Sequence, residues 1–102
     1  MEEFNISVEN RTKLGSSGVR KISREGKVPG ILYQGKESLP IEINKDELRA
    51  ILAGRMEEDL VLNVNFENRQ FKAKIKEVQR EPLGGEILHV DLMPIEADNY
   101  IH

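Results

Sequence analysis

A stretch of regular alternation between apolar and polar residues in the second half of the chain places the tightest limit on its fold. From Leu60 to Phe66 every second side chain is apolar, and the same pattern returns at Phe71. Glu67 and Asn68 separate the two runs, and a connection of two residues makes a tight turn. The pattern predicts a β-hairpin, because a period of two places the apolar side chains on one face. On its second strand the opposite face is basic, with Lys72, Lys74 and Lys76.

Four further segments have the pattern or composition of strands, at residues 4–8, 30–34, 39–43 and 87–92. Turn-forming residues lie between most of them. The strand at 39–43 contains Pro40, which lacks a backbone N–H, so we expect it near a sheet edge. With the hairpin, these segments give six short strands.

Two short helices are predicted. The first extends from Ser17 to Glu25, with Ser17 as its N-cap. The second begins after Asn44, has Glu47 three residues beyond that cap, and ends before Gly54. Six strands with few helices predict a β-rich α+β fold, a six-stranded mostly antiparallel barrel with two to three short helices.

The chain has 102 residues, which suits one domain with a single modest core. We expect this domain to occupy residues 1–95 and residues 96–102 to form a flexible tail. The absence of cysteine excludes disulfides and thiolate metal sites. The sequence shows no secretory signal and no membrane span, so we expect a cytoplasmic protein.

The segment from Arg11 to Lys27 concentrates positive charge. It holds six basic residues and one acid, a net charge of +5, in a chain of net charge −3. The remainder therefore carries −8, and a local basic region on an acidic protein indicates a site for a polyanion. The alternative is a solvated surface segment. With only 5% aromatic residues, base stacking has little support, and if the polyanion is a nucleic acid, a structured duplex is the favoured form. The candidate contacts are Arg11, Ser16, Ser17, Arg20, Lys21 and Arg24.

A second basic patch covers residues 69–80, where five basic residues accompany one acid. It includes Lys76 and ends with Gln79 and Arg80. If the last two strands pair through the turn at residues 81–85, Gln79 lies beside His89. Amide and guanidinium groups contact base edges and phosphates.

His89 and Asp91 are two positions apart on the last predicted strand, so both point away from Leu88, Val90 and Leu92. Three interpretations remain open. The pair could be a surface cross-strand contact, a polar pair that hydrogen-bonds RNA, or a general base oriented by an acid. Catalysis has the least support, because no nucleophile or metal-ligand pattern accompanies the pair. Nucleotide binding is also disfavoured, since the glycines at 15 and 18 belong to no Walker sequence, whereas contact of this loop with backbone phosphates stays open.

Five motifs in order carry a family resemblance: RTKLGSSGVRK, KVPGILYQGKE, PIEI, VQREP and HVDL. Over roughly residues 4–93 the chain resembles the bacterial large-subunit ribosomal proteins of the L-twenty-five/Ctc family. The resemblance implies a barrel related in shape to the anticodon-binding domain of glutaminyl-tRNA synthetase. It also implies binding of 5S ribosomal RNA, with no enzymatic role. We expect a short form without the long C-terminal domain of Ctc-type members.

The resemblance also implies roles for individual residues. Arg11, Ser16, Ser17, Arg20 and Lys21 match positions that approach the RNA backbone and groove. Gln79, His89 and Asp91 match polar positions on the barrel face that meets the RNA, with Arg80 beside them. Tyr33 matches a family tyrosine, for which we favour a packing or edge role.

The preferred function is thus a structural component of the large ribosomal subunit that binds 5S ribosomal RNA. We expect no cofactor, no membrane association and a monomer away from the ribosome. The alternative is a stress-associated protein-interaction module of the same fold with weakened RNA binding. Ser23, between Lys21 and Arg24, thins the arginines typical of the family and motivates that alternative.

Overall fold

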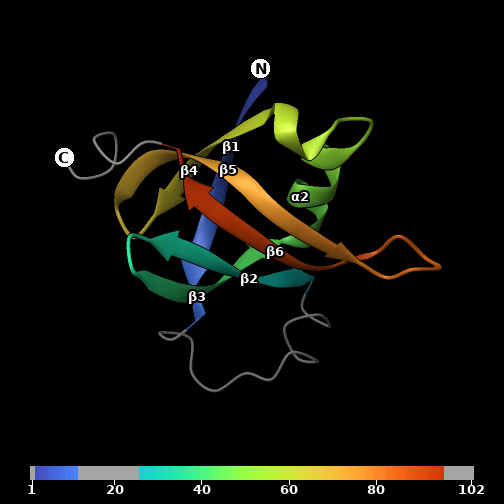
Figure 1. Cartoon of the computed structure of the whole chain (residues 1–102), viewed down its shortest axis with the longest axis horizontal. Coiled ribbons are helices and arrows are strands. Elements are labelled where there is room, and N and C mark those ends of the chain that lie inside the picture. The colour runs from blue at the N-terminus through green and yellow to red at the C-terminus, as the bar shows by residue number, and fades with distance from the viewer. Residues whose placement is uncertain (1, 12–25, 96–102) are drawn as a thin grey trace.

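The computed structural model describes residues 2–11 and 26–95 (Figure 1). The predicted helix at 17–25 and the predicted tail at 96–102 lie outside these residues. Within the described part, no helix is long and apolar enough to cross a membrane.

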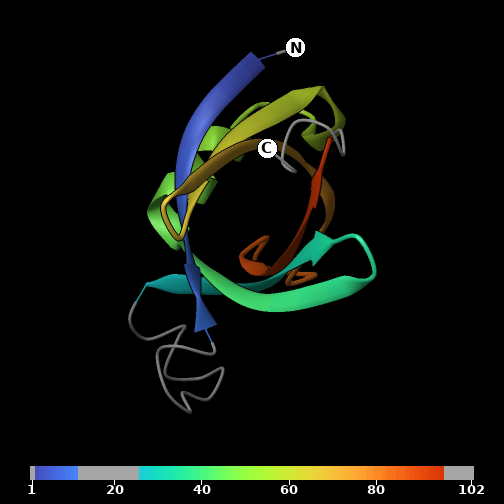
Figure 2. The same ribbon diagram turned by 90° about the vertical axis from the view of Figure 1, so that its left-hand side faces the viewer.

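The described residues form a closed six-stranded barrel, and Figure 2 looks into it, so that the strands form a ring. Around the barrel the strands follow the order β1, β3, β2, β6, β5, β4, and β4 then pairs with β1. Their bounds are β1 Glu2–Asn10, β2 Lys27–Gln34, β3 Glu37–Asn44, β4 Leu60–Phe66, β5 Arg69–Arg80 and β6 Ile87–Pro94. The six-stranded barrel predicted from the sequence is confirmed.

The sheet is mixed in direction. Four ladders are antiparallel, and two are parallel, namely β1 with β4 and β2 with β6. The antiparallel ladders include all three hairpins formed by strands that follow one another closely. The parallel ladders join strands distant in sequence, and they close the barrel.

The β4–β5 hairpin matches its prediction. Phe66 pairs with Arg69, and the two residues between them have positive φ angles, 48° at Glu67 and 66° at Asn68. Two successive positive φ angles define the turn whose twist matches that of the flanking strands. Asparagine adopts this conformation at low cost, so the local sequence fixes the register of this hairpin.

The inward-facing side chains fill the barrel with a single apolar core, whose largest fully buried member is Phe66. Each fully buried aliphatic side chain stabilises the fold by about 1.5–3 kcal/mol relative to an exposed one. The other fully buried core residues are Ile6, Val28, Leu32, Ile41, Ile43, Leu48, Leu60, Leu62, Val64 and Leu92. In a barrel with this few strands, side chains are enough to fill the interior.

One α-helix, α2 (Lys45–Leu52), closes an end of the barrel. Asn44 caps it, since its Oδ1 accepts a hydrogen bond from the backbone N–H of Glu47 at 2.9 Å. Leu48, Ile51 and Leu52 are buried against the core. The capped helix is as predicted, and the other helical element in the described residues is a short 3₁₀ turn, η2 (Glu57–Asp59).

The expectation that Pro40 marks a sheet edge is wrong. Strand β3 lies between β1 and β2 in the closed barrel. Its ladder with β1 covers only Ile41 to Ile43, whereas Pro40 pairs with Ile31 of β2. Proline has no backbone N–H to donate, but position 40 has no partner on β1, so no hydrogen bond is lost on that side. An interior strand therefore tolerates proline at this position.

Candidate nucleic-acid interface

Gln79 and His89 lie directly opposite each other on the antiparallel strands β5 and β6. The sequence predicted this lateral neighbourhood, and the register confirms it. Asp91 points to the same outer side of the barrel, two positions further along β6. Together with Lys76 and Tyr33, these residues form a surface that we call the polar barrel face: Tyr33, Lys76, Gln79, His89 and Asp91.

A bulge in β6 gives His89 its outward direction. Arg80 pairs with Ile87, whereas Gln79 pairs with His89, so Leu88 is an extra residue on β6. Ile87 is buried and Leu88 is 48% exposed. The prediction that Leu88 faces the core is therefore wrong, because the bulge interrupts the alternation on which it relied. From His89 onward the alternation is regular again.

The His89–Asp91 pair is close but not well aligned. The Nδ1 atom of His89 lies 3.2 Å from Oδ1 of Asp91. Even so, this oxygen is buried and has no hydrogen-bond partner among the residues that the structure describes. Asp91 as a whole is only 8% exposed, and Glu77 lies opposite it on β5. A buried acceptor without a donor costs about 1–3 kcal/mol, and burial keeps this oxygen from direct contact with a partner outside the barrel.

The geometry gives catalysis no further support. In the described ranges, no group of three or more His, Asp or Glu side chains could hold a metal ion. On β5 the residue opposite His89 is Gln79, and on β2 the residue before Gly30 is Pro29. Neither side chain is a nucleophile.

A second bulge places Lys76 on the polar barrel face. Ile75 pairs with Leu92 and Glu77 with Asp91, so Lys76 is the extra residue, on β5. Its Nζ lies 4.3 Å from the centroid of the Tyr33 ring, a cation–π distance. Tyr33 therefore positions a cation, a role beyond the packing or edge role favoured from the sequence.

Arg80 is on a different side of the hairpin from Gln79. It lines a groove with Arg49 of α2, while Gln79 lies opposite His89. Adjacent residues of a strand point to opposite sides, which explains the separation. The sequence analysis placed Arg80 beside Gln79, His89 and Asp91. In the structure Arg80 directly follows Gln79 on β5, but it lines the groove near α2.

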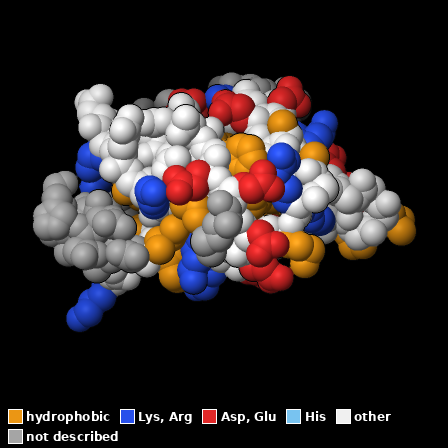
Figure 3. All heavy atoms as spheres, turned by 90° about the horizontal axis from the view of Figure 1, so that it is seen from above, with side chains coloured by type: hydrophobic (Ala, Val, Ile, Leu, Met, Phe, Trp, Pro, Cys, Tyr) orange, Lys and Arg blue, Asp and Glu red, His pale blue; other side chains and the backbone are white. Residues whose placement is uncertain are grey.

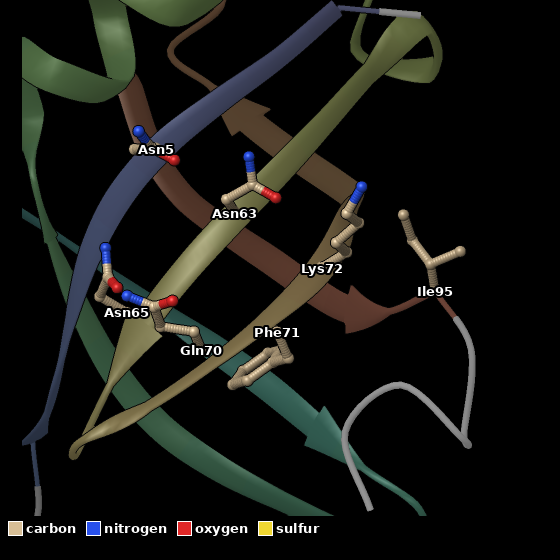
Figure 4. A pocket seen from close by; sticks show the side chains of 7 residues that line it. All are labelled: Asn5, Asn63, Asn65, Gln70, Phe71, Lys72 and Ile95. Atoms are coloured by element: carbon tan, nitrogen blue, oxygen red, sulfur yellow. The ribbon is translucent and has the colours of Figure 1, made fainter. Parts of the chain in front are cut away.

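The basic patch of β5 is divided between two sides of the barrel. Lys72 donates to Oε1 of Glu3 at 3.2 Å, and this hydrogen bond is the main cause that lowers the pKa of Glu3 below its ordinary value. Lys72 also lines a depression of about 830 Å³, most of whose other residues are neutral amides (Figure 4): Asn5, Asn63, Asn65 and Gln70. The charge of Lys72 is thus compensated by Glu3, whereas Lys76 lies over the Tyr33 ring on the polar barrel face.

The described ends of the basic segment are joined near β3. Arg11 follows β1, and Lys27 begins β2, the strands on either side of β3. Lys27 donates to Oε1 of Glu9 at 3.0 Å, which ties the two ends together. Strand β2 also pairs with β6, the strand that carries His89. The predicted contacts between these ends lie outside the described residues: Ser16, Ser17, Arg20, Lys21 and Arg24.

Positive and negative side chains are mixed over the surface as well. On the side seen in Figure 3, acidic and basic groups alternate, with apolar side chains between them. The described part therefore shows no extended area of one sign on this side. A partner bound on this side would meet charges of both signs.

The sequence profile of the Ribosomal L25p family matches residues 6–92, and the chain belongs to this family. It is a family of ribosomal proteins and not of enzymes. The large ribosomal subunit protein bL25 of Moorella thermoacetica is 35% identical over 103 residues, which cover 97% of this chain and 50% of that protein. The bL25 protein of Thermodesulfovibrio yellowstonii is 29% identical, over 99% of this chain and 47% of the relative. That of Streptomyces coelicolor is 35% identical, over 94% and 48%. This chain spans about half the length of these relatives.

Proposed function

We propose that the chain is a structural, non-catalytic component of the large ribosomal subunit that binds 5S ribosomal RNA. Binding would use the basic segment that begins at Arg11 and the polar barrel face. Membership of a ribosomal protein family supports the assembly. The choice of 5S RNA rests on the motif resemblance, and the arrangement of polar side chains on the barrel supports an RNA partner.

The observation that carries the proposal is the pairing of Gln79 with His89 on neighbouring strands, with the Nδ1 of His89 3.2 Å from Asp91. Gln79 is exposed and His89 is partly exposed. RNA offers partners for an amide and an imidazole, in its 2′-hydroxyl groups and base edges.

The two parts of the proposed interface have different tasks. The segment from Arg11 to Lys27, with its net charge of +5, would neutralise phosphates and supply most of the affinity. The polar barrel face carries Lys76, but Glu77 and Asp91 lie opposite each other beside it. Its mixed charge suits hydroxyls and base edges, and it would therefore select the shape of the RNA.

The proposal assigns residues 1–95 to one RNA-binding domain, active as a monomer in the cytoplasm and bound to the ribosome. It needs no cofactor.

The test measures binding of the purified protein to 5S ribosomal RNA by fluorescence anisotropy, over a range of salt concentrations. We expect binding that weakens steeply with salt, and a loss of about tenfold for Gln79→Ala. Arg20→Ala should weaken binding and reduce the salt slope by about one. Gln70→Ala is the matched control, because Gln70 lies on the same strand but lines the depression in Figure 4. Absence of binding even at low salt would reject the proposal.

A second candidate is a protein-interaction module with weak RNA binding. It is favoured by Leu83, which is 97% exposed at the β5–β6 turn, and by the exposed Leu88. The net charge of −3 also suits a protein partner. Co-purification with a defined protein, together with absence from washed ribosomes, would favour this candidate over the first.

A further inference from the structure

A groove opens between the end of α2 and the β5–β6 hairpin, which lie on the same side of the barrel in Figure 1. Its volume is about 650 Å³, and Leu52, Ala53 and Ile87 give it an apolar floor. Arg49 from α2 and Arg80 from β5 both line it. Two guanidinium groups from distant parts of the sequence therefore share one groove, outside the polar barrel face.

The carboxylate in this groove is already paired. Glu86 lines the groove, and Lys45 donates to its Oε1 at 2.7 Å. This hydrogen bond is also the main cause that lowers the pKa of Glu86, so the carboxylate stays ionised and bound to Lys45. Lys45 is its main partner, and the charge of Arg49 adds a smaller lowering of the same pKa.

The arginines themselves have little to hold them within the protein. Arg49 lies 4.0 Å from Asp46, and both side chains are largely exposed, an arrangement worth little energy. Arg80 makes no hydrogen bond or ion pair among the residues that the structure describes. Guanidinium groups form paired hydrogen bonds with phosphate oxygens, so two of them beside one groove suit an oxyanion.

The C-terminal end of α2 adjoins the groove, and it repels an anion less than the free end of a helix would. The last carbonyls of a helix are a negative pole. Here the Nη1 of Arg55 donates to the carbonyls of Ala50, Ile51 and Ala53 at 3.2–3.4 Å. The entrance is also open, since a Cβ added at Gly54 or Gly85 would meet nothing within 4 Å.

We infer that this groove is a phosphate subsite in which Arg49 and Arg80 hold a phosphodiester group of the bound RNA. The inference rests on the proposed function. It extends the interface around the hairpin, because Arg80 directly follows Gln79 on β5. The groove lies around the end of β5 from the polar barrel face, because Gln79 and Arg80 are adjacent in the strand and point to opposite sides of it.

The experiment measures binding of 5S ribosomal RNA over a salt series for Arg49→Gln, Arg80→Gln and the double variant. We expect each single change to weaken binding about three- to tenfold at low salt and to lower the salt slope by about one. The double variant should lose less than the product of the two, because both arginines hold one group. Arg69→Gln is the control, since Arg69 lies at the far end of β5 over the Phe66 ring.

The Arg49→Gln variant is the decisive one, because Arg49 belongs to α2 and is not part of the polar barrel face. If wild type binds and Arg49→Gln binds with the same affinity and slope, the subsite is rejected and the proposed function stands. If wild type itself does not bind, both fail. Thermal unfolding of each variant checks that the exposed substitutions leave the fold intact.

Discussion

Gly30 of β2 lies so close to Val90 of β6 that a Cβ at position 30 would be 2.1 Å from the Val90 carbonyl oxygen. The two residues pair in the parallel ladder that joins the halves of the barrel. His89 and Asp91 flank Val90, so this close approach also sets the position of the polar barrel face. A glycine here is required for packing, with no need for an unusual φ angle.

Gly30→Ala should therefore destabilise the protein by about 3 kcal/mol, because the obstacle is backbone that cannot rotate away. Denaturant unfolding followed by circular dichroism measures the loss. Gly35→Ala is the control, with a φ of 60° but open space around its Cβ. It should cost only about 1 kcal/mol. Equal losses for the two variants would contradict the role assigned to the β2–β6 contact.

Asn44→Ala should lower the free energy of unfolding by about 1 kcal/mol, the usual cost of losing an N-cap side chain. The reason is the hydrogen bond from the N–H of Glu47 to Oδ1 of Asn44. The measurement is again denaturant unfolding. Asn5→Ala removes an exposed amide that caps no helix, and we expect it to change stability by less than 0.5 kcal/mol, as surface substitutions of this kind do within about that range. If Asn44→Ala is equally neutral, the cap contributes nothing.

The ion pair between Lys45 and Glu86 should make stability depend on pH. Because the pKa of Glu86 is lowered in the folded state, its contribution is present above the ordinary value of 4.5 and is lost as pH falls below it. Glu86→Gln should therefore be less stable than wild type at pH 7, and the difference should shrink as pH falls from 7 toward 3. Chemical unfolding at both pH values tests this difference.

Glu81→Gln is the control for this comparison, since Glu81 belongs to the same turn. Added salt at pH 7 should narrow the difference between wild type and Glu86→Gln, because the Glu86 side chain is partly open to solvent. A difference that persists unchanged at pH 3 would show that the amide disturbs packing and not charge pairing.

The sequence was most informative where structure depends on neighbouring residues. The turn at Glu67 and Asn68 and the cap at Asn44 follow from residue types a few positions apart, and both are confirmed. The Gln79–His89 neighbourhood also follows from one hairpin, because its register depends on a short turn.

Features that join distant residues could not be read in the same way. The parallel ladder of β2 with β6 links Gly30 to Val90, and no local pattern specifies such a partner. The pairing of Lys72 with Glu3 spans 69 positions, and it removes Lys72 from the basic surface. The bulge at Leu88 escaped notice because an apolar residue there fits the alternation that the bulge interrupts.

Asp91→Asn should separate stability from RNA binding. In the folded protein the Oδ1 of Asp91 is buried without a hydrogen-bond partner in the described residues, and the Glu77 carboxylate lies on the facing strand position. Removing the charge lowers the cost of burying this oxygen and the repulsion from Glu77, at the expense of the contact with His89. We therefore expect the variant to be at least as stable as wild type, by up to about 1 kcal/mol. Its affinity for 5S ribosomal RNA should fall about tenfold, because the imidazole of His89 loses the carboxylate that lies beside it on the polar barrel face. Unfolding and anisotropy measurements on the same preparation test both halves, with Glu77→Gln as the control for loss of charge alone. A variant that loses stability while keeping wild-type affinity would show that the pair serves the fold and not the RNA.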